Sequence, residues 1–196
     1  MDGILGLRRT ASRATRLLTA ALVLGVLWGC DGGGKSLGGH ATGSLEALSV
    51  PDAPVEAPTE TFLAPDGTAT DLSAFRGRVV VLNVWAMWCR PCRTELPTIA
   101  ALDSAYGDEI AVVAVNVDRT PQEVETARAF LSEHAPLAFY SDPTFELPFR
   151  LPGRGAMPQT ILIDRDGRIR AWLAGEADWN SPEARALIDT LVAEDA

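Results

Sequence analysis

The feature that most constrains the fold is the stretch from Val79 to Pro97, which reads VVVLNVWAMWCRPCRTELP. A mostly β-branched apolar run leads to Cys89 and Cys92, after which the residues become good helix formers. This pattern predicts a buried strand that runs into a helix, with both thiols at the junction. Two cysteines three residues apart in a first helical turn share one face, so they can form a disulfide with little backbone movement. The pair can therefore switch between dithiol and disulfide.

The helix start also distinguishes the two thiols. Unpaired amide N–H groups and the helix dipole stabilise negative charge there, so the pKa of Cys89 is expected to be lowered. We interpret Cys89 as the nucleophile and Cys92 as the resolving thiol. Arg90 adds a cation that favours the thiolate. Pro91 restricts the dipeptide that tunes the redox potential, and its missing N–H costs little early in a helix.

A zinc site is the main alternative explanation for the two cysteines. Zinc needs about four ligands, and beyond Cys89 and Cys92 the chain offers only Cys30, His40 and His134, which do not recur at ligand spacing. A structural disulfide across so short a loop would constrain little of the unfolded chain. The strand-to-helix context therefore favours redox chemistry that needs neither a metal nor a bound cofactor.

Two segments resemble the TlpA/ResA-like family of membrane-tethered thioredoxin-fold proteins. The string VVLNVWAMWCRPCRTELP resembles the family's active-site segment, and GAMPQTILIDRDGRI at 155–169 resembles its cis-proline segment. The resemblance covers roughly residues 57–193. It implies an α/β, thioredoxin-like fold with a mixed central sheet flanked by helices. It also implies a thiol:disulfide oxidoreductase whose electrons are held in the cysteine pair.

The resemblance assigns further site residues. Trp88 flanks a flat apolar surface that receives the partner protein in the family, although packing in the core is an equal alternative. Met157 and Pro158 resemble the pair that lies opposite the two cysteines, with a cis bond between them and backbone hydrogen bonds from Met157 to the partner chain. A cis X–Pro bond needs tertiary support, which sequence alone does not reveal.

Glu95 is the candidate proton acceptor for the resolving thiol. It lies three residues after Cys92, on the same face of the expected helix. If partly buried, it can take the proton from Cys92 when that thiol attacks a mixed disulfide. An ordinary glutamate favoured by the helix dipole is the alternative. Asn83 stands where cytosolic thioredoxins carry a buried aspartate, and it cannot ionise.

The N-terminal residues 1–29 are typical of an export signal. Four arginines precede an apolar stretch from Leu17 to Trp28, which is too short for a full membrane span. The sequence from Leu27 to Cys30 resembles the lipobox of bacterial lipoproteins, which implies lipidation of Cys30. An uncleaved N-terminal anchor is the alternative, since Trp28 replaces the usual small residue. Either way, we expect the protein in the bacterial cell envelope, tethered to the membrane with its domain outside the cytoplasm.

The remaining chain divides into a linker and one domain. Residues 30–58 are rich in Gly, Ser, Ala and Pro, which predicts a flexible tether with a solvated His40. Residues 59–196 suit one compact domain. The strands and helices expected in it are an N-terminal hairpin at 61–63 and 69–71, a helical turn at 72–75, strands at 79–86, 110–117, 137–140, 159–163 and 168–174, and helices from 90 to about 106, at 121–134, at 145–151 and from about 182 to 193. The segment 121–140 resembles the helix-strand insertion of TlpA-like domains.

Charge and resemblance together shape the expected function. The formal net charge of −9 argues against a nucleic-acid partner. By resemblance the protein reduces disulfides in protein substrates such as apocytochrome c or copper-site assembly proteins, with a membrane thiol reductase as its electron donor. A peroxiredoxin is one alternative, but Leu82 and Ala86 stand where that class carries proline and the peroxide-binding threonine. A copper-binding chaperone is the other, with His134 as its only histidine in the expected domain.

Overall fold

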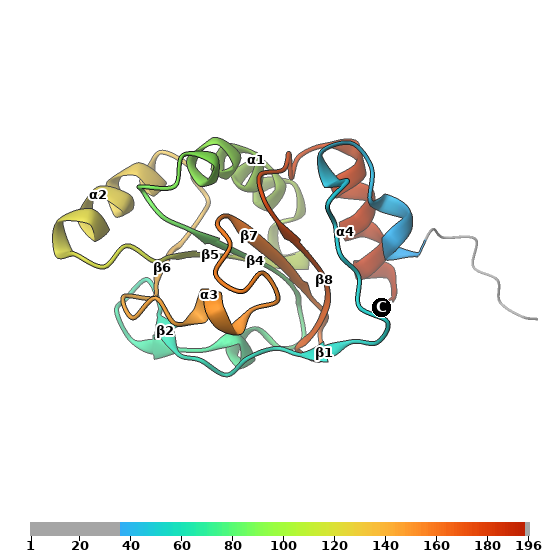
Figure 1. Ribbon diagram of the computed structural model, residues 1–196, viewed down its shortest axis with the longest axis horizontal. Helices are drawn as coiled ribbons and strands as arrows, with labels where there is room; N and C mark the ends of the chain where they lie inside the picture. Colours follow the sequence, from blue (N-terminus) through green and yellow to red (C-terminus); the bar gives the residue numbers. More distant parts are fainter. Residues whose placement is uncertain (1–35, 195–196) are drawn as a thin grey trace, which may run out of the picture. The chain divides into compact units, whose positions relative to one another are not determined.

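The computed structural model describes residues 36–194, and it contains one mixed eight-stranded sheet. Within those residues no helix has the length and apolar character needed to cross a membrane. The strands are β1 (Val55–Glu56), β2 (Phe62–Leu63), β3 (Ala69–Thr70), β4 (Val79–Trp85), β5 (Ile110–Asn116), β6 (Phe139–Ser141), β7 (Gln159–Ile163) and β8 (Arg168–Ala174). Their order across the sheet is β1-β8-β7-β4-β5-β6-β2-β3 (Figure 1).

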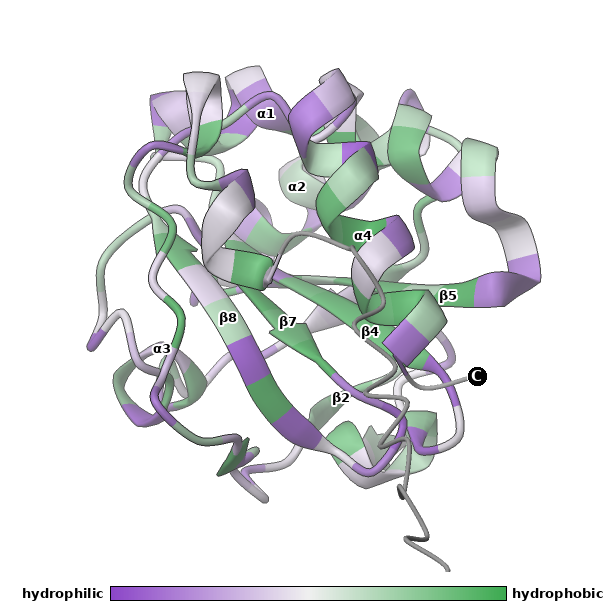
Figure 2. Ribbon diagram, turned by 90° about the vertical axis from the view of Figure 1, so that its right-hand side faces the viewer, coloured by the Kyte–Doolittle hydropathy of each residue, from purple (hydrophilic) through white to green (hydrophobic). Residues whose placement is uncertain are grey.

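The centre of the sheet is formed by β4 between β5 and β7. β4 pairs in parallel with β5, from Val79 opposite Ile110 to Trp85 opposite Asn116, and antiparallel with β7. Every residue of these three strands is buried, and Figure 2 shows them apolar along most of their length. β8 instead alternates buried and partly exposed residues. Continuous apolar runs mark strands that are covered on both faces, whereas alternation marks a strand with one face open.

Within residues 36–194, four α-helices accompany the sheet: α1 (Arg90–Tyr106), α2 (Pro121–Ser132), α3 (Leu147–Arg150) and α4 (Pro182–Glu194). Figures 1 and 2 both show α1 and α4 on one side of the sheet, with α3 apart from them. α2 begins as its sequence predicts. Thr120 and Glu123 form a capping box around Pro121, which satisfies amide donors that the first helical turn leaves free.

The flexible tether predicted for residues 30–58 is wrong for the part that the structure describes. Residues 37–56, here called the docked segment, pack against the domain. Leu37 and Leu45 are buried in its core, within the short 3₁₀ helices η1 (Leu37–His40) and η2 (Gly43–Leu45). β1 pairs with β8, and Ser49 exchanges two backbone hydrogen bonds with Trp172, of 2.8 and 2.9 Å. The folded domain therefore begins well before the predicted boundary at residue 59.

The prediction for His40, which lies in the docked segment, is wrong as well. The prediction left this side chain in solvent, but it is only 7% exposed, and its Nε2 lies 3.0 Å from the hydroxyl oxygen of Thr190 on α4. The composition of the segment misled the prediction, because a few spaced leucines in a background of Gly and Ser bury little area by themselves. These leucines become part of the core only because α4 and β8 provide the apolar surface against which the docked segment packs.

Most other expected elements occur close to their predicted positions. β2 and β3 form the N-terminal hairpin, residues 72–75 form a 3₁₀ turn, and α2 with β6 forms the expected helix-strand insertion. The insertion strand is shifted, covering Phe139–Ser141 in place of 137–140, and α2 ends at Ser132 in place of His134. Cys30 and the predicted export signal lie outside the described residues.

Candidate active site

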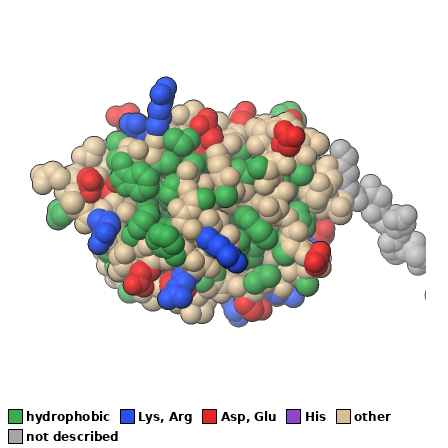
Figure 3. Space-filling model, in the orientation of Figure 1, with side chains coloured by type: hydrophobic (Ala, Val, Ile, Leu, Met, Phe, Trp, Pro, Cys, Tyr) green, Lys and Arg blue, Asp and Glu red, His purple; other side chains and the backbone are tan. Residues whose placement is uncertain are grey.

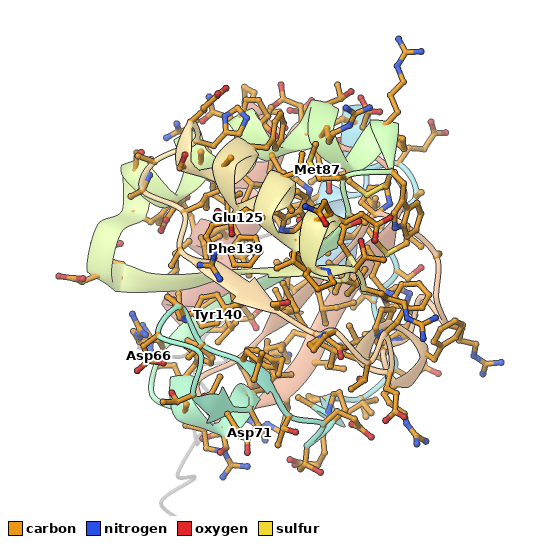
Figure 4. The ribbon with its side chains drawn as sticks, turned by 90° about the vertical axis from the view of Figure 1, so that its left-hand side faces the viewer. Asp66, Asp71, Met87, Glu125, Phe139 and Tyr140 are labelled. Carbon is orange, nitrogen blue, oxygen red and sulfur yellow. A yellow bond between two sulfur atoms is a disulfide. The ribbon has the colours of Figure 1, made fainter. Side chains whose placement is uncertain are left out.

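The two cysteines lie where β4 gives way to α1. The strand ends at Trp85, three loop residues follow, and Cys89 occupies the N-cap position of α1. Figure 4 shows Met87, in that loop, at one end of the molecule, while Asp66 and Asp71 of the β2–β3 hairpin region lie at the other. The site therefore occupies the end of the sheet to which the carboxyl ends of β4 and β5 point.

Cys89 and Cys92 form a disulfide. Their sulfur atoms are 2.01 Å apart, and their Cα atoms are 5.3 Å apart. Cys92 is fully buried, whereas Cys89 is 5% exposed. The sulfur of Cys89 accepts a hydrogen bond from the backbone N–H of Cys92 at 3.3 Å. In the reduced state the same N–H group, at the positive end of the helix dipole, would stabilise a thiolate on Cys89.

Arg90 and Pro91 occupy the first turn of α1, between the two thiols. The side chain of Arg90 is exposed. Among the described residues it takes part in no ion pair, so its charge remains available at the surface beside Cys89. Pro91 removes only an N–H that the first turn of a helix leaves unpaired.

Glu95 is buried inside α1, one helical turn beyond Cys92. Its exposed fraction is 1%. One carboxyl oxygen accepts a hydrogen bond of 2.7 Å from the side-chain amide of Asn83 on β4, and the other accepts a hydrogen bond of 3.2 Å from the backbone N–H of Ala177. Burial raises the pKa of Glu95 to about 8, against the opposing effect of these two hydrogen bonds. Near neutral pH the carboxyl group is thus able both to hold and to release a proton.

A surface pocket of about 400 Å³ reaches Glu95 from the side of the loop that follows β8. Thr94 and Thr98 of α1 form one part of its wall, while Ala177 and Asp178 form another. Ser44 of the docked segment completes it, so the residues that were predicted to be a tether contribute to the surroundings of Glu95. The pocket gives water a route towards the buried carboxyl group.

The peptide bond between Met157 and Pro158 is cis, as the resemblance implies. Pro158 leads directly into β7, the neighbour of β4, and its carbonyl accepts a hydrogen bond of 2.9 Å from the backbone N–H of Gly175. The next residue, Gln159, is fully buried and donates from its side-chain amide to the carbonyl oxygens of Pro148 and Ala156, at 3.0 and 3.2 Å. This side chain ties the cis-proline loop to α3.

Trp88 lies on the surface and is 58% exposed, which argues against the core position that the sequence left open. Its ring packs edge to face on Phe145 at 6.2 Å, and Phe145 packs in the same way on Phe149 at 5.4 Å. Phe149 is 57% exposed. Sequence reasoning missed both phenylalanines, because nothing local distinguishes an aromatic residue that packs into the core from one that faces solvent.

Two buried aspartates near the site were also missed. Asp118 is fully buried and accepts hydrogen bonds from the backbone N–H of Met87 at 2.8 Å and from the side-chain amide of Asn116 at 2.7 Å. It therefore holds the loop that leads to Cys89. Asp142 organises the residues before α3 in a similar way. Asp118 lies two residues after the end of β5, and a charged residue so close behind a buried strand was the signal available in the sequence.

The residues weighed for other functions lie in ordinary structural positions. Leu82 and Ala86 are fully buried. His134 packs on Phe130, with ring centroids 4.8 Å apart. Within residues 36–194 there is no group of three or more His, Cys, Asp or Glu side chains placed to hold a metal ion. The described residues thus bring together Cys89, Cys92 and Glu95.

Known proteins resemble the chain in sequence and in fold. The Redoxin family model matches residues 51–188. The thioredoxin-like protein YneN of Bacillus subtilis is 32% identical over 121 residues, which is 59% of this chain and 67% of YneN. The thiol-disulfide oxidoreductase ResA of Bacillus cereus is 30% identical over 122 residues, covering 62% of this chain and 69% of ResA. A crystal structure described as a thiol:disulfide interchange protein DsbE, from Chlorobium tepidum, is 31% identical with a TM-score of 0.63, covering 74% of this chain and 99% of that one.

Proposed function

The chain belongs to the Redoxin family, and from that premise we propose that this thiol:disulfide oxidoreductase reduces disulfides in exported proteins through Cys89 and Cys92. The observation that carries the proposal is the pairing of the two cysteines at the start of α1 with a buried glutamate one turn further on. A disulfide that served stability alone would need no titratable group beside it. A thiol that must lose its proton during the reaction does.

The reaction consists of two thiol–disulfide exchanges. The Cys89 thiolate attacks one sulfur of the substrate disulfide, forms a mixed disulfide and releases the first substrate thiolate. Cys92 then loses its proton and attacks Cys89, which releases the second substrate thiolate. Two electrons pass from the enzyme to the substrate, the released thiolates take up two protons, and the Cys89–Cys92 disulfide remains. A reduced thiol partner must afterwards regenerate the dithiol.

Glu95 is proposed to accept the proton of Cys92 in the second exchange. A base works best when its pKa lies near that of the group it deprotonates and near the working pH. The pKa of Glu95, raised to about 8 by burial, is near the value of about 8.5 for an unperturbed thiol. The pocket between α1 and the loop after β8, which Glu95 lines, supports a path along which that proton could pass to water.

The direction of electron flow is the part of the proposal that local chemistry leaves open. The helix N-terminus and Arg90 stabilise the reduced form, which would make the pair an oxidant, whereas a proton-accepting Glu95 favours a reductant. The resemblance to TlpA/ResA-like proteins supports the reductase. We expect a redox potential closer to that of thioredoxin, about −270 mV, than to that of DsbA, about −120 mV.

Equilibration of the purified protein against mixtures of reduced and oxidised glutathione tests the direction. The fraction of disulfide is measured by thiol alkylation and mass spectrometry. A potential near −270 mV supports a reductase, whereas a value above about −180 mV, the region of protein disulfide isomerase, would leave an oxidase or isomerase on the same fold.

The substrates are proposed to be exported proteins with redox-active cysteines, such as apocytochrome c or the assembly proteins of copper sites, and the electron donor a membrane thiol reductase. These assignments come from the family resemblance. A Cys92→Ser variant produced in cells should retain its partners as mixed disulfides, and mass spectrometry of the retained proteins identifies them. Recovery of only cytosolic proteins would argue against an exported enzyme.

The membrane attachment is proposed to be a lipid on Cys30. The chain offers five residues between Cys30 and the first described residue, Ser36. Because an extended chain spans at most about 3.6 Å per residue, so short a linker reaches only on the order of 20 Å. The docked segment therefore makes the proposed tether shorter than the composition of residues 30–58 indicates.

A further inference from the structure

Two exposed aromatic side chains, Trp88 and Phe149, are joined by the partly buried ring of Phe145, and together the three form a cluster that starts beside Cys89 and that we call the aromatic surface. The planes of neighbouring rings are inclined by 74° and 89°, so each ring meets the next edge to face. Figure 3 shows hydrophobic side chains gathered on the face of the molecule where α3 lies. Apolar side chains left in water cost free energy, and a contiguous exposed group of them marks a surface that another molecule covers.

The backbone of Phe145 is held in an unusual conformation. Its φ angle is 61°, in the left-handed region that bulky residues rarely adopt, at a cost of about 1–3 kcal/mol. The carboxylate of Asp142, which is 1% exposed, accepts hydrogen bonds from the backbone N–H groups of Thr144, Phe145 and Leu147, at 3.0, 3.2 and 2.9 Å. A buried charge thus secures a strained turn that keeps Phe145 between the two exposed rings.

Phe149 is positioned by the loop that leads to the cis-proline. A Cβ atom on Gly155 would lie 2.5 Å from the Phe149 ring, so the ring rests directly on the glycine backbone. The N–H of Gly155 donates to the carbonyl of Pro148 at 2.8 Å, and the side-chain amide of Gln159 donates to the same oxygen at 3.0 Å. The exposed ring is therefore fixed relative to Pro158, and hence to the place where a substrate chain would approach the cysteines.

Two arginines add positive charge on the segments that carry these rings. Arg154, directly before Gly155, is exposed, and with φ 49° it is the only described non-glycine residue besides Phe145 in the left-handed region. Arg90, beside Cys89, is exposed as well. In the described part of the chain neither arginine forms an ion pair, although the protein carries a formal net charge of −9. An acidic group is attracted to these two cations and repelled by most of the remaining surface.

We propose that the aromatic surface selects polypeptide substrates that carry an aromatic or long aliphatic side chain close to the disulfide cysteine, with an acidic residue beside it. The apolar side chain packs on Trp88 and Phe149, and the acidic residue faces Arg154. This inference rests on the proposed function, since it names the substrate class for the same two exchange steps. The inference adds no further reactant to those two exchange steps.

Synthetic peptides of equal length test the proposal against the reduced full-length protein. Each peptide has one cysteine in a mixed disulfide with 2-mercaptoethanol. The first carries phenylalanine and aspartate near the cysteine, the second phenylalanine and lysine, and the third only glycine and serine. The rate constant of reduction is measured for each. The wild type is expected to prefer the first peptide over the third about tenfold, which corresponds to 1.4 kcal/mol and matches the size of a single aromatic contact.

Matched variants separate the two parts of the surface. In Phe149→Ala the preference for the first peptide over the third should fall to the part that the aspartate contributes, while Val55→Ala, which truncates a similarly exposed side chain on β1, should keep it in full. In Arg154→Asn the preference for aspartate over lysine should disappear, since asparagine tolerates the left-handed backbone but carries no charge. The control for Arg154→Asn is Arg76→Gln, which removes the charge of another exposed arginine, directly after the 3₁₀ turn at 72–75.

The possible outcomes are distinct. A wild type that reduces all three peptides equally, or a Phe149→Ala variant with the full preference, overturns the inference while leaving the proposed function in place. A wild type that reduces none of the peptides and not even 2-hydroxyethyl disulfide overturns both. Sedimentation of the same proteins tests whether a second copy of the chain, and not a substrate, covers the aromatic surface. If the wild type dimerises and Phe149→Ala does not, the surface is an interface between copies and the inference is wrong.

Discussion

The side-chain amide of Asn83 lies 2.7 Å from a carboxyl oxygen of Glu95, and both side chains are buried. The same amide nitrogen lies 3.0 Å from the hydroxyl oxygen of Thr160. An amide can serve either protonation state of its neighbour. As placed, it donates to the carboxylate, and after a half-turn its oxygen would accept from the protonated carboxyl group and from the Thr160 hydroxyl. Asn83 can therefore keep a hydrogen bond to Glu95 whether the carboxyl group is protonated or not, and it does so without ionising itself.

Glu95 should make the stability of the protein fall as the pH rises. Burial raises its pKa from 4.5 in the unfolded chain to about 8 in the fold. Between these values the folded state holds a proton that the unfolded state has released. The free energy of unfolding therefore falls by up to about 1.4 kcal/mol per pH unit. The stabilisation is complete below the unfolded pKa and is lost as the pH rises through the folded one.

Denaturant unfolding between about pH 5 and pH 8 measures this slope. The slope should flatten in Glu95→Gln and stay unchanged in Glu125→Gln, an exposed glutamate of α2. The slope is the informative quantity, because a glutamine cannot accept hydrogen bonds from both Asn83 and Ala177 and should lower stability at every pH. Equal slopes in the wild type and Glu95→Gln would show that the carboxyl group titrates normally.

The second exchange step should also depend on Glu95. With a general base whose pKa is about 8, the rate at which Cys92 resolves a mixed disulfide should rise with pH through that value. In Glu95→Gln the step should slow by on the order of 10²-fold, the lower end of the range usual for a lost general base. Rapid-quench trapping of the mixed disulfide measures it. An unchanged rate with an unchanged pH profile would make Glu95 purely structural.

The two cysteines should behave differently when replaced singly. Cys89 is the more accessible thiol, at the N-cap of α1, whereas Cys92 is fully buried. We expect Cys92→Ser to accumulate a stable mixed disulfide with a substrate and Cys89→Ser to form none. Electrophoresis without reductant, followed by mass spectrometry of the adduct, detects both results. A stable adduct on Cys92 in the Cys89→Ser variant would reverse the assignment of attacking and resolving thiols.

The docked segment should contribute to stability. Leu45 is fully buried, and truncation of a buried leucine to alanine costs about 2–5 kcal/mol. Val50, in the same segment but 39% exposed, should tolerate Val50→Ala within about 0.5 kcal/mol. Denaturant unfolding of the two variants gives the comparison. If Leu45→Ala were as harmless as Val50→Ala, residues 37–56 would be the flexible tether that their composition predicts.

Metabolic labelling tests the proposed lipid on Cys30. Cells grown with a labelled fatty acid should yield a labelled wild-type protein, because the sequence from Leu27 to Cys30 resembles a lipobox. The Cys30→Ala variant should carry no label. A wild type that stays unlabelled yet remains with the membrane would instead indicate an uncleaved N-terminal anchor.

Local features of the fold were predictable because their causes are local. The apolar run of β4, the start of α1 directly after Cys89 and the start of α2 at Pro121 each depend on residues within one or two turns of chain. Propensity and periodicity express such causes directly. The chemistry of the cysteine pair could be inferred for the same reason, since spacing and position in the helix determine whether two thiols can meet.

The properties that make this site particular depend on residues far apart in the sequence. The raised pKa of Glu95 requires burial, together with contacts from Asn83, 12 residues before it, and Ala177, 82 residues after it. The docked segment becomes ordered only against α4 and β8, which lie at the other end of the chain. Burial and desolvation are sums over all atoms that the fold brings near a group. The sequence by itself therefore determined which residues can react, and only the tertiary structure decided how readily Glu95 exchanges a proton and which side chains surround the substrate.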